Sequence, residues 1–95
     1  MDLYVIRRRS NWVDADDLEA AAARSTAEGE KMSDEVRWIR SYVVEEEDGR
    51  LGTACIYEAA SPEAIRRHAE NAGMQADEIT KVADTVIVRD DPVPV

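Results

Sequence analysis

Residues that favour β-strands are concentrated in four stretches of the chain, and two of these stretches alternate side chains between opposite faces. Turn and cap residues separate them, including an Asp-Gly pair at residues 48–49 that is typical of a hairpin. We therefore expect four strands, the last of which could divide near residues 83–84. Their predicted bounds are residues 3–8, 36–44, 51–58 and 79–89.

Two further stretches carry the signals of helices. The first begins at Asp14, a good N-cap, and runs to about residue 28, with Gly29 as a candidate end. The second begins at Ser61, with proline at the first helical position, and stops at Gly73. The stripe predicted to be buried on the first helix has small side chains that favour close packing on a sheet: Leu18, Ala21, Ala22 and Ser25.

The resulting order is strand, helix, strand, strand, helix, strand. This is the ferredoxin-like α+β arrangement, βαββαβ, with two helices on one face of an antiparallel sheet. The stretch 36–44 is apolar on both sides, whereas a sheet with one face in water should alternate apolar and polar residues. We therefore expect a homodimer through the open sheet face, with a single domain over residues 1–90 and a flexible tail over residues 91–95.

The chain has 95 residues and a net charge of −9, which limits the classes of partner. Nucleic-acid binding needs a clustered basic surface, and the basic run at residues 7–9 would alternate between the two faces of a strand. No stretch approaches the roughly 20 apolar residues of a membrane span. A lone cysteine provides no disulfide framework and fits a reducing compartment. We expect a cytoplasmic protein that binds neither nucleic acids nor membranes.

Several segments resemble a family of small bacterial ferredoxin-like proteins, of unestablished function, that are often described as nickel-binding. The likeness extends over residues 3–89, and is carried by Gly73 and by residues 37–43, 55–59, 61–69 and 79–82. The resemblance implies a ferredoxin-like fold, a dimer, and the binding of nickel or another divalent transition metal. It identifies no particular metal ligands in this chain.

His68 and Cys55 are the candidate metal ligands. Imidazole suits nickel, copper and zinc, and thiolate is a soft ligand. Each residue also has a plainer interpretation: His68 as a hydrogen-bonded histidine at the edge of a buried helix stripe, and Cys55 as a small buried strand residue. A structural zinc site normally needs four Cys or His ligands. Any metal must therefore recruit carboxylates, water, backbone atoms or a second subunit.

A second group of residues is a candidate ligand pocket or dimer interface: Trp38, Arg40, Tyr42 and Tyr57. The first three fall on one side of their predicted strand, and Tyr57 could join them, depending on the register. Aromatic side chains with an arginine can hold a planar or anionic molecule. The same residue types are enriched at protein interfaces.

The sequence supports no catalytic mechanism, because it contains no Gly-rich phosphate loop, nucleophile elbow or paired histidines on a helix. The leading hypothesis is a non-enzymatic, nickel-type metal-binding protein, with a role in metal homeostasis. One alternative is a small-molecule-binding protein or enzyme of the dimeric α+β barrel type, with a cavity beside Trp38, Tyr42 and Tyr57. Another is an acidic protein-interaction module.

Overall fold

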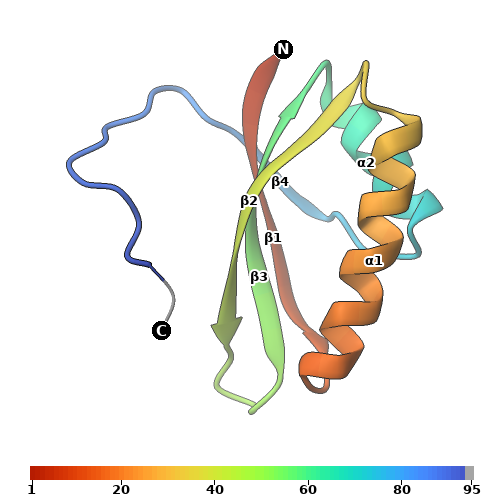
Figure 1. The fold of residues 1–95 in the computed structure, drawn as a ribbon, viewed down its shortest axis with the longest axis vertical. Helices are drawn as coiled ribbons and strands as arrows, with labels where there is room; N and C mark the ends of the chain where they lie inside the picture. The colour runs from red at the N-terminus through yellow and green to blue at the C-terminus, as the bar shows by residue number, and fades with distance from the viewer. Residues whose placement is uncertain (94–95) are drawn as a thin grey trace.

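The computed structural model describes residues 1–93, which form an antiparallel sheet with both helices on one of its faces (Figure 1). The strand order across the sheet is β2-β3-β1-β4. This arrangement confirms the predicted ferredoxin-like α+β fold. In chain order the elements are β1 (Asp2–Trp12), α1 (Ala15–Lys31), β2 (Val36–Glu45), β3 (Leu51–Ala59), α2 (Pro62–Asn71) and β4 (Glu78–Lys81).

Side-chain caps fix the beginnings of both helices, as the sequence predicts. The Asp14 carboxylate accepts a hydrogen bond from the backbone N–H of Asp17 at 2.9 Å, and Ser61 Oγ accepts one from Ala64 at 3.2 Å. Helix α1 continues past Gly29 to Lys31, and the N–H of Met32, the C-cap residue, donates to the Gly29 carbonyl. No helix among residues 1–93 is long and apolar enough to cross a membrane.

The core lies between the helices and the inner face of the sheet. Residues of β1 and β3 alternate onto this face and meet directly across the strands, Tyr4 opposite Tyr57 and Ile6 opposite Cys55. Ile65 of α2 is completely buried against them. Burying a side chain of this size stabilises a fold by roughly 1.5–3 kcal/mol. Helix α2 therefore closes one half of the inner face with large apolar contacts.

Strand β4 is shorter than the predicted strand at residues 79–89. It pairs with β1 over only four residues, and the Val82 N–H then donates to the Leu3 carbonyl. Because the two strands are antiparallel and β1 begins at Asp2, the chain beyond residue 82 runs past the end of its partner.

The segment after residue 82 crosses to the side of the sheet opposite the helices (Figure 1). Its side chains at residues 86–88 are between 75% and 85% exposed. Of the predicted tail at residues 91–95, residues 94–95 lie outside the described part of the chain.

A β-bulge in β2 changes which side chains share a face. Trp38 lies opposite Tyr57 and Arg40 lies opposite Ile56, so Ile39 is an extra residue between them. Trp38 consequently faces the helices, whereas Arg40 and Tyr42 face the other side of the sheet. The prediction that Trp38, Arg40 and Tyr42 share one side is wrong, because a strict alternation takes no account of a one-residue insertion.

Candidate functional site

A cavity of about 330 Å³ lies between α1 and the inner face of the sheet. Its α1 wall is the predicted stripe of small residues, and the opposite wall includes Ser41 of β2 with Thr53 and Cys55 of β3. Because both walls carry small side chains, they leave space between helix and sheet instead of filling it. This volume is at the lower end of the range for ligand pockets, about 300–1,000 Å³.

Both tryptophans of the chain line this cavity. Trp38 stacks on Tyr57 with ring centroids 6.2 Å apart and an interplanar angle of 8°. Trp12 lies beyond an irregularity in β1, where the register shifts and Ser10 has a φ of 53°. A non-glycine residue in this backbone region costs on the order of 1–3 kcal/mol. The fold therefore accepts local strain next to the cavity.

Arg8 brings a buried positive charge to the cavity wall. The residue is 3% exposed; its Nε donates to the Gln75 carbonyl at 2.6 Å, and its Nη1 lies 3.5 Å from Cys55 Sγ. Its Nη2 atom is buried and has no hydrogen-bond partner among residues 1–93. None of the ion pairs found in that part of the chain includes Arg8. Uncompensated buried charge is unfavourable for folding.

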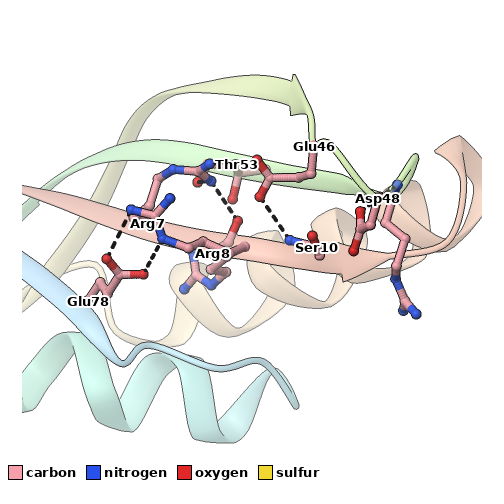
Figure 2. Close-up of polar contacts among 9 residues, drawn as sticks. Arg7, Arg8, Ser10, Glu46, Asp48, Thr53 and Glu78 are labelled. Atoms are coloured by element: carbon pink, nitrogen blue, oxygen red, sulfur yellow. Dashed lines mark hydrogen bonds and ion pairs between the residues drawn. The ribbon is translucent and has the colours of Figure 1, made fainter.

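The arginines on either side of Arg8 do have carboxylate partners. Arg7 forms a 2.7 Å ion pair with Glu46, and the other carboxylate oxygen of Glu46 accepts a hydrogen bond from the Ser10 N–H. Arg9 forms a 2.7 Å ion pair with Glu78. Figure 2 shows these carboxylates around β1, with Thr53 on the neighbouring strand. The alternation of β1 turns the middle arginine toward the helices, where no carboxylate within residues 1–93 reaches it.

Cys55 takes part in a hydrogen-bonded chain on the cavity wall. Ser41 Oγ donates to Cys55 Sγ at 3.0 Å and accepts from Trp38 Nε1 at 2.7 Å. The neighbouring Thr53 Oγ1 is buried and has no partner among residues 1–93. The cavity wall therefore carries two polar groups that the described residues leave unsatisfied, on Arg8 and on Thr53.

His68 is buried between α2 and α1, at 1% exposure. Its Nε2 lies 2.9 Å from the Ser25 carbonyl oxygen, and since a carbonyl can only accept, Nε2 must carry the proton. Its ring centroid is 5.6 Å from that of Tyr57. The Tyr57 hydroxyl lies 3.2 Å from Ser25 Oγ, and burial raises the pKa of Tyr57. This geometry matches the plainer interpretation of His68.

The two candidate metal ligands are not brought together. Cys55 lines the cavity described above, whereas His68 lines a second hollow between α1, α2 and the start of β2, and Tyr57 contributes to both. Residues 1–93 contain no cluster of three or more His, Cys, Asp or Glu side chains that could hold a metal ion. A cation at Cys55 would also be repelled by the Arg8 guanidinium. The pair does not fit a nickel site within one subunit.

The remaining candidates, Arg40 and Tyr42, meet the C-terminal segment on the outer face of the sheet. Arg40 Nη1 lies 2.7 Å from one carboxylate oxygen of Asp91, and the Tyr42 hydroxyl is 2.8 Å and 2.9 Å from its two oxygens. Hydrogen bonds from Tyr42 and then from Arg40 lower the pKa of Asp91. These two residues hold the segment after β4 against the sheet.

Sequence reasoning missed Arg8 and Thr53 as site residues. A signal for Arg8 was present, because it continues the alternation of Tyr4 and Ile6 and so belongs to the apolar face of β1. An arginine at such a position must find a partner or a function.

Comparisons with known proteins place the chain in a family. Its fold is similar to that of the crystal structure of SCO4226 from Streptomyces coelicolor A3(2), with a TM-score of 0.70 and 25% sequence identity. The alignment covers 88% of this chain and 99% of that one. No curated protein matches the chain. Residues 4–82 match the family described as "Nickel responsive protein SCO4226-like". The chain therefore belongs to this SCO4226-like family.

Proposed function

We propose that this protein binds a small organic molecule in the cavity between α1 and the sheet. The observation that carries the proposal is the cavity itself: about 330 Å³, lined by both tryptophans and by Arg8 and Thr53, each of which has a buried polar atom without a partner among residues 1–93. Ligand sites in proteins combine mostly apolar walls with a few convergent polar groups. We propose binding without catalysis, because no base among residues 1–93 is hydrogen-bonded to Cys55 or Ser41.

Tryptophan fluorescence provides a direct test, since Trp12 and Trp38 both line the cavity. A set of small aromatic and aliphatic compounds, charged and neutral, would be titrated into the wild type, Ala22→Phe and Ala23→Phe. Ala22 lines the cavity, whereas its neighbour Ala23 is exposed. We expect saturable binding that Ala22→Phe abolishes and Ala23→Phe preserves. Absence of any fluorescence change, or equal binding by both variants, would contradict the proposal.

The family supports a second proposal, that the protein binds nickel in metal homeostasis. His68 and Cys55 supply the only imidazole and the only thiol in the chain, and both are ligand types that suit nickel. Because the two lie in separate hollows, the site would use one of them together with groups from a second copy or from water.

Calorimetric titration of nickel into the wild type, His68→Ala and Cys55→Ser tests this second proposal. Tight stoichiometric binding that is lost in one of the variants would support it. Weak heat of equal size in all three proteins would contradict a specific site at these residues.

We also propose that the protein is a cytoplasmic homodimer, paired through the outer sheet face. That face carries Val5 opposite Ile56, and the apolar side chains of residues 86–88 are exposed on the same side. The buried free thiol of Cys55 is compatible with a reducing compartment. Light scattering after size exclusion should give a dimer for the wild type and a monomer for Ile56→Glu. A monomeric wild type would contradict the dimer.

A further inference from the structure

Arg8 stands out because this chain has an excess of acidic side chains. It contains 21 Asp and Glu residues and 12 Lys and Arg residues, so carboxylate partners are abundant. Exposed arginines such as Arg37 and Arg67 form ion pairs at the surface, where such pairs add little stability. The buried guanidinium, for which a counter-charge matters most, has none among residues 1–93.

The two residues that carry unsatisfied groups are neighbours in the sheet. Arg8 and Thr53 are direct cross-strand partners in β1 and β3, both are 3% exposed, and both line the cavity. Arg8 Nη2 offers N–H donors, and the Thr53 hydroxyl can donate as well. Two neighbouring donors suit the two oxygens of one carboxylate, and a guanidinium matches that planar group better than any other side chain.

We propose that the ligand of this cavity is a small organic carboxylate. Its carboxylate accepts hydrogen bonds from Arg8 Nη2 and Thr53 Oγ1, two buried atoms that side-chain rotation on ligand entry brings to the cavity surface. Its apolar body lies among the small residues of α1 and against Trp38. The apolar walls favour an organic acid over a free inorganic anion. This inference rests on the proposed small-molecule function. It adds that the ligand is negatively charged and that Arg8 and Thr53 recognise it.

The test compares acids with their neutral amides, which have nearly the same shape. Benzoate, phenylacetate and 3-phenylpropionate, their primary amides, and inorganic phosphate would be titrated by tryptophan fluorescence and by thermal shift. In the wild type we expect at least one acid to bind about tenfold or more tightly than its amide, as a charge-assisted hydrogen bond implies. We expect phosphate to bind more weakly than that acid.

Two variants separate the role of Arg8 from a general charge effect. In Arg8→Met the preference for acid over amide should disappear, whereas Arg9→Met, which removes an equal charge from an exposed neighbour, should retain it. Circular dichroism confirms that each variant folds, and the wild-type comparison stands without them. A preference that survives in Arg8→Met would overturn the inference.

The remaining outcomes distinguish this inference from the proposed function. Equal binding of acids and amides to the wild type would overturn the carboxylate inference and leave a neutral small-molecule site. Tighter binding of phosphate than of any acid would overturn the organic part of the inference. Binding of no compound would overturn both proposals.

Discussion

Arg8 and Thr53 lie opposite each other on β1 and β3, and each presents a buried polar atom with no partner among residues 1–93. Both residues line one cavity. Groups that are costly for folding are retained in proteins where they serve binding, so functional sites are often locally less stable than they could be.

Replacing Arg8 by methionine should leave the free energy of unfolding unchanged or raise it by up to about 1–2 kcal/mol. The substitution removes an unpaired buried charge and retains an unbranched side chain, at the loss of two hydrogen bonds, one to the Gln75 carbonyl and a long one to Cys55 Sγ. Urea denaturation would measure the change. The control is Arg7→Met, which breaks the pair with Glu46 and should destabilise. A larger loss in Arg8→Met than in Arg7→Met would identify Arg8 as a structural residue.

Two glycine-to-alanine substitutions should have opposite effects on stability. A Cβ at Gly52 would lie 2.5 Å from the backbone oxygen of Arg8 and from a Glu46 carboxylate oxygen. Gly52→Ala should therefore destabilise the protein by about 1–3 kcal/mol. A Cβ at Gly29 makes only an ordinary van der Waals contact, with His68 at 3.7 Å. Because alanine favours a helix more than glycine does, Gly29→Ala in α1 should stabilise the protein by about 1 kcal/mol. Thermal denaturation should show a lower melting temperature for Gly52→Ala and a higher one for Gly29→Ala. A Gly52→Ala protein as stable as the wild type would contradict the close packing of β1 against β3.

The Asp91 carboxyl should titrate below its ordinary pKa, because the Tyr42 hydroxyl and then the Arg40 guanidinium stabilise its charged form. A lowered folded-state pKa gives stability that is present above the unfolded pKa and is lost as pH falls through the folded one. Carbon-detected NMR titration would measure it. Tyr42→Phe and Arg40→Gln should each return the pKa of Asp91 toward its ordinary value. An ordinary Asp91 pKa in the wild type would show that the segment after β4 leaves the sheet in solution.

The neutral imidazole of His68 should be the Nε2–H tautomer, because Nε2 donates to the Ser25 carbonyl. Nitrogen NMR distinguishes the two tautomers directly. Nickel bound through Nε2 would have to break this hydrogen bond, whereas Nδ1 is buried and has no partner among residues 1–93. Observation of the Nδ1–H tautomer would contradict the packing of α2 against α1 at this residue.

The sequence by itself determined the order of the elements and the beginnings of the helices. Asp14 and Ser61 cap through bonds that span three residues, so local sequence is enough to specify them. The strand alternation likewise identifies the inner face of β1, because it depends only on backbone geometry. With two helices separating strands in this order, few chain paths other than the ferredoxin-like one satisfy the rules of connection.

The tertiary structure alone decided the composition of the site. The bulge at Ile39 separates Trp38 from Arg40 and Tyr42, and it depends on pairing with β3 rather than on any pattern within β2. Similarly, the lack of a partner for Arg8 and the distribution of Cys55 and His68 into separate hollows depend on packing between distant segments. Local sequence encodes which residues face inward in a regular strand, but bulges, cavities and unsatisfied charges arise from how several elements fit together.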